Sequence, residues 1–127
     1  MTKVVLDASA LLAVLQLEAG ADVIADRLGH AHISVVNLSE VAGKLIDGGA
    51  SLDAARRIIG VLTLSIEDVD EAMAYAAAAL RPATRKAGLS LGDRMCLALA
   101  QRMAVPALTT DNVWHGLDVG VEIRVAR

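Results

Sequence analysis

The sequence predicts a single α/β domain, in which helices flank an open, mostly parallel sheet. Its 127 residues suit one domain and no more. Hydrophobic residues make up 55% of the chain but aromatic residues only 2%, so the core must be aliphatic. Short apolar runs alternate with helix-like segments, and this alternation is typical of helices packed on a buried parallel sheet. We therefore expect residues 1–127 to form one domain.

The expected elements follow one another without repeats or linkers. Gly20 separates the first two helices, Gly48 and Gly49 close the third, Ser51 caps the fourth, and Pro82 stops the fifth. The expected strands are 3–7, 32–36, 64–66, 106–110 and 121–125. The expected helices are 8–16, 21–28, 37–46, 52–62, 67–80 and 91–103, with a polar loop at 81–88 and with Asn37 opening the third helix.

Charge, cysteine content and hydropathy limit the classes of protein. The net charge of −3 argues against a protein that coats nucleic acid nonspecifically, but it leaves open an enzyme with an acidic site. Cys96 is the only cysteine, which fits a reducing cytoplasm. No apolar run approaches the roughly 20 residues that span a bilayer, so no membrane association is expected. Asp7 interrupts the N-terminal apolar run, which we interpret as structure and not as a targeting signal.

Two acidic residues follow expected strands directly. Asp7 ends the first strand, and Asp111 ends the strand over residues 106–110. The ends of parallel strands point to one edge of a sheet, where a site in such folds usually lies, so both carboxylates can meet there. Each could equally cap the helix that follows it, and a cap does not exclude a metal ligand.

Asp93 lies at the start of an apolar helical stripe that continues through Cys96, Leu97 and Ala100. We expect Arg94 on the opposite, outward side of this helix. An inward acid needs a cation or a hydrogen-bond donor as a partner, although a first-turn acid is also favoured by the helix dipole.

The spacing around Glu40, taken alone, indicates a structural role for this residue. Residues 37–40 (NLSE) match a capping box, and Lys44 lies one turn further along the same face.

Carboxylates are hard oxygen ligands that suit Mg²⁺ or Mn²⁺. A group of them at a sheet edge, with phosphate as a further ligand, suits hydrolysis of a phosphodiester bond by a metal-activated water. One or two ions are compatible with four carboxylates.

Four segments together resemble the PIN-domain family, in order and in spacing. They are residues 4–13 (VVLDASALLA), 36–41 (VNLSEV), 90–100 (SLGDRMCLALA) and 108–114 (LTTDNVW), followed by a closing strand over 121–125 (VEIRV). The third segment is the most specific. The resemblance covers nearly the whole chain, and its size is most similar to VapC-type toxins of bacterial toxin–antitoxin pairs.

The resemblance implies a PIN-like fold and a Mg²⁺-dependent endoribonuclease, with Mn²⁺ as a substitute. Asp7, Glu40, Asp93 and Asp111 would hold the metal and orient the attacking water, which changes the structural interpretation of Glu40. Ser9 would support the first acid, and Asn112 would have a supporting role. The implied partners are an RNA substrate, an antitoxin protein and a second copy of the chain. Neither the RNA target nor the antitoxin follows from the sequence.

Other residues carry weaker signals. Exposed basic residues that could contact phosphate are Arg81, Arg85, Lys86 and Arg94. His30 and His32 form an H-x-H pair without a third ligand, so we do not expect a transition-metal site. Trp114 could stack on an RNA base, but we expect it to anchor the segment after Asp111. Early apolar residues exceed what one core face needs and suggest a dimer or antitoxin surface: Leu11, Leu12, Leu15, Leu17, Val23 and Ile24.

Two other functions are compatible with an acidic α/β domain. A phosphoacceptor signalling domain would need adjacent acids after the first strand, an aspartate after a middle strand and a lysine after a late strand. Here Asp7 stands alone, Ile66 is followed by a helix-starting acidic run, and no lysine follows a late strand. A catalytically silent PIN-like binding module remains the alternative, although the presence of all four acids disfavours it.

Overall fold

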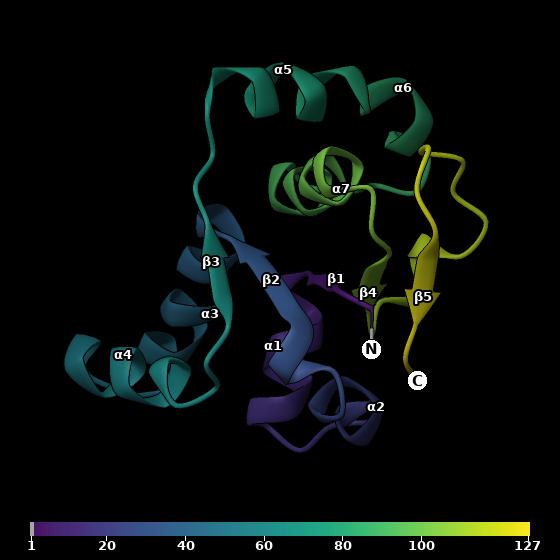
Figure 1. The fold of residues 1–127 in the computed structure, drawn as a ribbon. Coiled ribbons are helices and arrows are strands. Elements are labelled where there is room, and N and C mark those ends of the chain that lie inside the picture. The colour runs from purple at the N-terminus through teal and green to yellow at the C-terminus, as the bar shows by residue number, and fades with distance from the viewer. Residues whose placement is uncertain (1) are drawn as a thin grey trace.

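The computed structural model describes residues 2–127 and confirms the predicted α/β class (Figure 1). Within these residues, five strands form one sheet in the order β3-β2-β1-β4-β5, and every neighbouring pair is parallel. Their bounds are β1 (Val4–Leu6), β2 (Ala31–Ser34), β3 (Ser65–Glu67), β4 (Ala107–Thr109) and β5 (Ile123–Val125).

The strand order places a topological switch point at β1. From this central strand the chain builds outward through β2 and β3 on one side, and later through β4 and β5 on the other. The connection that follows β1 leads toward β2, whereas the connection that follows β4 leads toward β5 on the opposite side. In open parallel sheets, this divergence creates the crevice in which ligands bind.

Helices cover both faces of the sheet. On one face α7 packs against the strands, with α5 and α6 outside it; on the other lie α1, α2 and α3, with α4 against α3 (Figure 1). The helices are α1 (Ala8–Leu15), α2 (Ala21–Ala25), α3 (Val35–Asp47), α4 (Leu52–Gly60), α5 (Glu71–Ala79), α6 (Arg81–Thr84) and α7 (Leu91–Met103), with 3-10 turns at Leu28–His30 and Asn112–Trp114.

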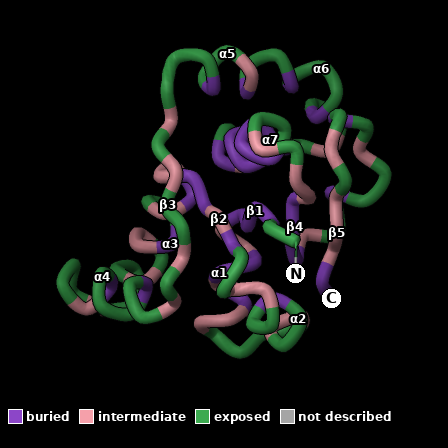
Figure 2. The backbone as a smooth tube through the Cα atoms, in the orientation of Figure 1, coloured by how far each residue is buried: buried purple, intermediate pink, exposed green. Residues whose placement is uncertain are grey.

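The core is aliphatic, as the composition predicts, except for the buried side chain of Trp114. Val5 belongs to the apolar cluster on the α7 side, whereas Val4 and Leu6 belong to the cluster on the α1 side. All three are fully buried, because both faces of the central strand are covered. Burial of each such side chain contributes roughly 1.5–3 kcal/mol to folding. Figure 2 shows that β1, β4, most of β2 and much of α7 are buried, whereas the edge strands β3 and β5 and the outer helices are more exposed.

Several predicted element boundaries are wrong, and three of the differences concern α3, α5 and α6. Helix α3 begins at Val35 and not at Asn37, because Ser34 ends β2 and its Oγ accepts a hydrogen bond from the Asn37 amide at 3.1 Å. Strand β3 continues to Glu67, so α5 starts only after its cap, Asp70. Residues 81–84 of the predicted loop form α6, in whose first turn Pro82 needs no amide hydrogen.

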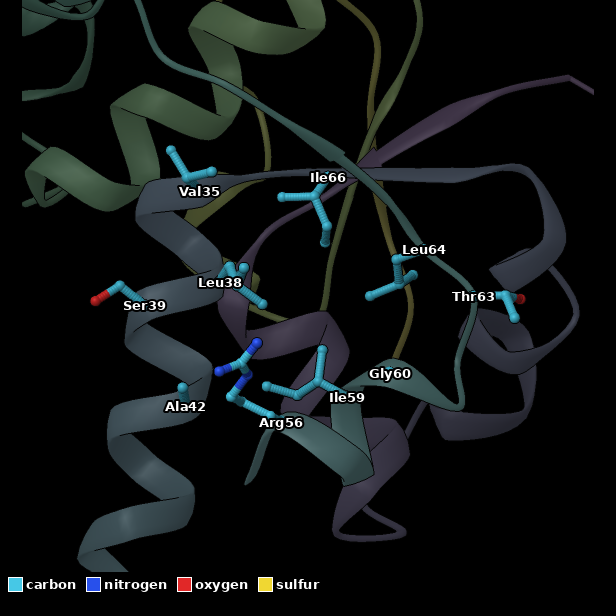
Figure 3. Close-up of a pocket in the computed structure, with 10 residues that line it drawn as sticks. All are labelled: Val35, Leu38, Ser39, Ala42, Arg56, Ile59, Gly60, Thr63, Leu64 and Ile66. Atoms are coloured by element: carbon cyan, nitrogen blue, oxygen red, sulfur yellow. The ribbon is translucent and has the colours of Figure 1, made fainter. Parts of the chain in front are cut away.

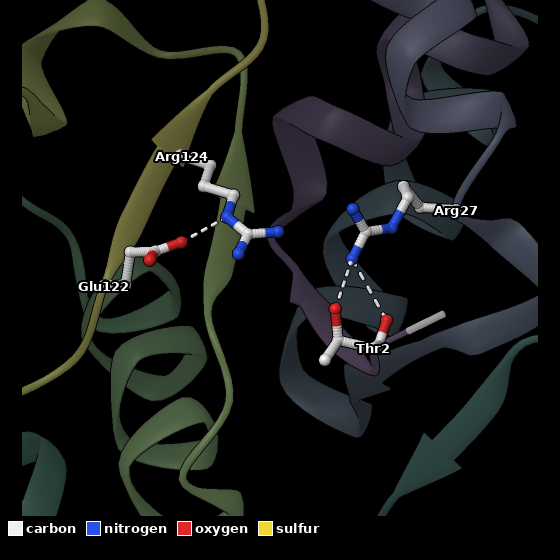
Figure 4. Close-up of polar contacts among 4 residues, drawn as sticks. All are labelled: Thr2, Arg27, Glu122 and Arg124. Atoms are coloured by element: carbon white, nitrogen blue, oxygen red, sulfur yellow. Dashed lines mark hydrogen bonds and ion pairs between the residues drawn. The ribbon is translucent and has the colours of Figure 1, made fainter.

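Polar contacts fix the periphery of the sheet (Figure 4). Arg27 Nη2 donates to the carbonyl oxygen of Thr2 at 3.0 Å, which ties the segment before β1 to the turn after α2. Arg124 pairs with Glu122 beside the edge strand β5, and charges at an edge discourage pairing with another strand. Within residues 2–127, no helix has the length and apolar character needed to cross a bilayer.

Candidate active site

Asp7 is a buried carboxylate at the carboxyl end of β1. Its side chain is 2% exposed and accepts hydrogen bonds from Thr109 Oγ1 at 2.6 Å, from the Ala10 amide at 2.9 Å and from Ser9 Oγ at 2.8 Å. Burial and, to a smaller extent, the nearby charge of Asp93 nevertheless raise the pKa of Asp7 from 3.8 to about 6. Asp7 therefore caps α1, and a nearby cation would stabilise its buried negative charge.

Asp93 lies in the first turn of α7, half-buried. One of its carboxylate oxygens accepts a hydrogen bond from the Ser90 amide at 2.9 Å, while Ser90 Oγ accepts one from the Asp93 amide. This capping box fixes the carboxylate at the start of the helix. Asp93 is therefore a first-turn acid that also caps α7, and this cap does not exclude a metal ligand.

Glu40 reaches the same turn of α7 from α3. Its carboxylate lies directly over Gly92, where an added Cβ would be 2.3 Å from Glu40 Oε1. Only glycine leaves room for the carboxylate at this position. The favourable pair expected with Lys44 is absent among the ion pairs of residues 2–127; instead, Asn37 Nδ2 donates to Glu40 Oε1 at 2.8 Å.

The thiol of Cys96 is affected by the charges of three of the acids. It is fully buried one helical turn after Asp93. Burial raises the pKa of the Cys96 thiol well above its ordinary value, and the charges of Asp7, Asp93 and Glu40 raise it further. The charges of these three carboxylates therefore act on one buried side chain near the start of α7.

Asp111 lies shortly after the end of β4. It caps the 3-10 turn Asn112–Trp114 by accepting from the Val113 amide at 3.0 Å, and its own amide donates to Thr109 Oγ1. Thr109 therefore links Asp111 to Asp7. Asp111 also lines a polar hollow of about 340 Å³ with Ser9 and Arg127, and it does not act on Cys96 as the other acids do.

The donor set fits a hard divalent cation, although the side chains do not form a closed cage. Across residues 2–127, no three His, Cys, Asp or Glu side chains converge as a complete ligand group. Mg²⁺ commonly keeps several waters and takes only one or two carboxylates from the protein. Asp7 supplies the buried charge that such an ion would compensate, and Asp93 lies close enough to interact with it electrostatically.

Comparison with known families decides the classification. The PIN domain family matches residues 4–119. The chain belongs to the PIN domain family. No curated protein sequence matches it significantly.

Solved structures support the PIN fold at low sequence identity. A toxin–antitoxin complex from Klebsiella pneumoniae aligns with a TM-score of 0.75 and 18% identity over 98% of both chains. VapBC2 from Rickettsia felis, bound to a promoter DNA fragment, gives 0.74 and 12% over 98% of both chains. VapBC-5 from Mycobacterium tuberculosis gives 0.64 and 24% over 100% of this chain and 99% of that one. At these identities the likeness concerns the fold alone.

The basic residues of this PIN domain fall into two groups. Arg81, Arg85 and Lys86 are exposed on and just after α6. Arg94, which we expected to face outward, is 7% exposed, and its Nη1 donates to the Ala77 carbonyl of α5 at 3.0 Å. That expectation was wrong because α5 and α6 cover the outer side of α7, so Arg94 lies between helices and is not a surface contact for phosphate.

The remaining predicted residues have mixed outcomes. Ser9 contacts Asp7, whereas Asn112 is exposed beside Asp111. Trp114 is fully buried, which supports its anchoring role and removes it as a stacking surface. His32 pairs with Glu67 at 2.8 Å.

The apolar residues of the early helices, which we expected to exceed the needs of the core, divide into three groups. Leu11 and Ile24 are core residues, Leu12 and Leu15 are half-buried, and Leu17 and Val23 are exposed.

A separate apolar groove lies between α3 and α4 (Figure 3). It has a volume of about 410 Å³, and Val35, Leu38 and Ala42 line it along one stripe of α3. None of the four acids contributes to it. Helix α3 therefore presents one stripe to the groove and another, with Asn37 and Glu40, to α7.

Sequence reasoning missed three residues that shape the site. Thr109 holds Asp7 and the Asp111 amide, Gly92 makes room for Glu40, and Asn37 joins α3 to α7. A glycine in the first turn of a helix, where it is a poor helix former, was the one available signal for Gly92. The other two depend on contacts between distant segments.

Proposed function

We propose that this PIN domain is a divalent-metal-dependent endoribonuclease that acts as the toxin of a toxin–antitoxin pair. One observation carries the proposal: Glu40 lies over Gly92 beside Asp93, and the charge of Asp93 acts on the buried carboxylate of Asp7 at the carboxyl end of β1. Such an acidic edge at a switch point is suited to a cation that also binds phosphate.

Asp7 and Asp93 are the residues that would hold Mg²⁺, for which Mn²⁺ would substitute. When bound, the ion supplies the positive charge that activates water and stabilises charge developing on the phosphodiester. Glu40, which lies beside Asp93, and Asp111, which is linked to Asp7 through Thr109, would bind or orient water at the site. Ser9 and Thr109 keep the Asp7 carboxylate in place through their hydroxyls. Asn112 would support the site from its exposed position beside Asp111.

Arg81, Arg85 and Lys86 would contact the phosphates of the RNA substrate. They are exposed and lie in the segment that leads directly into Ser90 and Asp93. Positive charge beside an acidic metal site offsets the repulsion between the carboxylates and a phosphate backbone.

An antitoxin and a second copy of the chain are the proposed protein partners, in the cytoplasm. Several solved structures similar in fold are toxin–antitoxin complexes. Leu17 and Val23 are 87% and 49% exposed, and apolar side chains at such exposure are suited to a protein interface. Co-expression with the adjacent open reading frame, followed by size-exclusion chromatography, would test both partners.

Cleavage of cellular RNA tests the proposal. Purified protein is incubated with a mixed RNA pool in Mg²⁺, in Mn²⁺ and in EDTA, alongside Asp93→Asn and Asp53→Asn. The asparagine introduced by Asp93→Asn can still accept from the Ser90 amide, so the helix cap is preserved, and Asp53 is a matched exposed acid in the first turn of α4. We expect metal-dependent cuts from the wild type and from Asp53→Asn but not from Asp93→Asn.

The alternative is a catalytically silent PIN-like binding module. The lack of a closed cage of three ligands within residues 2–127 is the observation that favours it. Folded wild-type protein, free of antitoxin, that cuts no RNA with either metal would support this alternative and contradict the nuclease.

A further inference from the structure

Asn37 has an unusual position for an asparagine in a helix. It is fully buried at the third residue of α3, and all polar atoms of its amide group are used. Its Oδ1 accepts from Ser34 Oγ at 2.8 Å, while Nδ2 donates to Glu40 Oε1 at 2.8 Å and to the Gly92 carbonyl at 3.0 Å. A buried amide with this complete set of partners has one fixed orientation.

The identity of these partners determines that orientation. A carboxylate oxygen and a backbone carbonyl only accept hydrogen bonds, so the amide nitrogen must face Glu40 and Gly92. The opposite orientation would place Oδ1 against two acceptors. Asparagine supplies two hydrogens from one atom, as this position requires.

The two donated bonds join the two segments that carry the acids. Glu40 belongs to α3, whereas Gly92 directly precedes Asp93 in α7, and the Glu40 carboxylate rests on the open face of Gly92. Glu40 itself is exposed at the surface, so without a partner its long side chain would sample several rotamers. The bond to Asn37 restricts the Glu40 side chain to one rotamer. It uses Oε1 of the carboxylate, and no side chain of this network donates a hydrogen bond to the other oxygen, Oε2.

We propose that Asn37 is a positioning residue for the acidic site, which sets the place of Glu40 relative to the turn that holds Asp93. This inference rests on the proposed metal-dependent function. Hydrogen-bond partners that orient metal-binding carboxylates commonly change metal affinity by roughly 10- to 100-fold when they are removed. A purely structural tie between α3 and α7 would instead change stability and leave the metal unaffected.

A double-mutant cycle read by Mn²⁺ binding separates these roles. Calorimetric titration of the full chain with Mn²⁺ compares wild type, Asn37→Ala, Glu40→Ala and the double variant. Thr84→Val is the matched control, because it also removes a buried side-chain hydrogen bond, from Thr84 Oγ1 to the Leu80 carbonyl, and this hydroxyl makes no hydrogen bond to any of the four acids. Thermal melting of each variant reports folding.

We expect Asn37→Ala to weaken Mn²⁺ binding by about tenfold in the wild-type background and to have no further effect once Glu40 is alanine. Thr84→Val should leave Mn²⁺ affinity unchanged. If Asn37→Ala does not fold, Asn37→Thr replaces it in the same cycle, because its hydroxyl fills more space but cannot serve both acceptors.

Equal weakening in both Glu40 backgrounds, or no weakening at all, would overturn the positioning role while leaving the metal site intact. Wild-type protein that binds no Mn²⁺ would overturn the proposed function and this inference with it. The two failures are therefore distinguishable in one data set.

Discussion

Replacement of Asp7 by asparagine should stabilise the metal-free protein at neutral pH. Asp7 is buried, and burial raises its pKa from 3.8 to about 6. The folded state therefore binds the proton more tightly than the unfolded state does. The stability that this preference contributes is fully present below about pH 3.8 and is lost as the pH rises through about 6.

The magnitude follows from the difference between the two pKa values. Since each pKa unit corresponds to about 1.4 kcal/mol, ionised Asp7 destabilises the folded state by about 3 kcal/mol above pH 7. Asparagine avoids this cost because it cannot ionise, and its Oδ1 can still accept from the Ala10 amide. The Thr109 and Ser9 hydroxyls must rearrange toward the new amide group, so the gain should be at most about 3 kcal/mol.

Urea unfolding in EDTA measures this effect at about pH 7.5 and about pH 4.5. Asp7→Asn should be more stable than the wild type at the higher pH, and the difference should shrink at the lower pH. Asp118→Asn removes the same charge at an exposed position and is the control. Saturating Mn²⁺ should reverse the order, because the ion stabilises only the protein that binds it.

An Asp7→Asn variant that is no more stable than the wild type at the higher pH, or a difference that does not change with pH, would refute this reasoning. Either result would mean that the hydrogen bonds to Asp7 already compensate its burial.

Three further substitutions test other parts of the structure. Gly92→Ala should weaken Mn²⁺ binding by roughly tenfold in calorimetry, because its Cβ would displace the Glu40 carboxylate; unchanged affinity would contradict this contact. Arg94→Met should alter RNA affinity by less than about twofold, because Arg94 is buried against Ala77; a larger loss in filter binding would show that it contacts RNA. The third substitution replaces three exposed basic residues together: Arg81, Arg85 and Lys86. The slope of the logarithm of RNA affinity against the logarithm of salt concentration should become shallower by up to about 2. An unchanged slope would exclude these residues as phosphate contacts.

Local sequence signals predicted the elements that begin with a clear cap. The bounds of α7 were predicted correctly because Ser90 precedes a continuous apolar stripe, and α4 begins after Ser51 as expected. Helix α3 was misplaced by two residues because Ser34 and Asn37 both fit the preferences of a cap. The burial of Ser34 at the end of β2 decides between them, and burial depends on the assembled sheet.

Local sequence signals also predicted the positions of two of the four acids. Asp7 and Asp111 follow strands, so parallel topology alone places them at one edge. The position of Glu40 depends on Gly92, which lies in a distant segment of the chain, and no local pattern reports that contact. Arg94 was misplaced because helical periodicity distinguishes two sides of a helix but does not reveal that α5 covers the second one.

The central claim is that the carboxyl edge of this sheet holds a divalent metal. Anomalous diffraction from crystals soaked in Mn²⁺ tests it most directly, because the signal locates the ion without reference to activity. We expect an ion bonded to Asp7 and Asp93 at about 2.1 Å, within reach of Glu40. An ion bound only elsewhere, or an empty edge at saturating Mn²⁺, would contradict it.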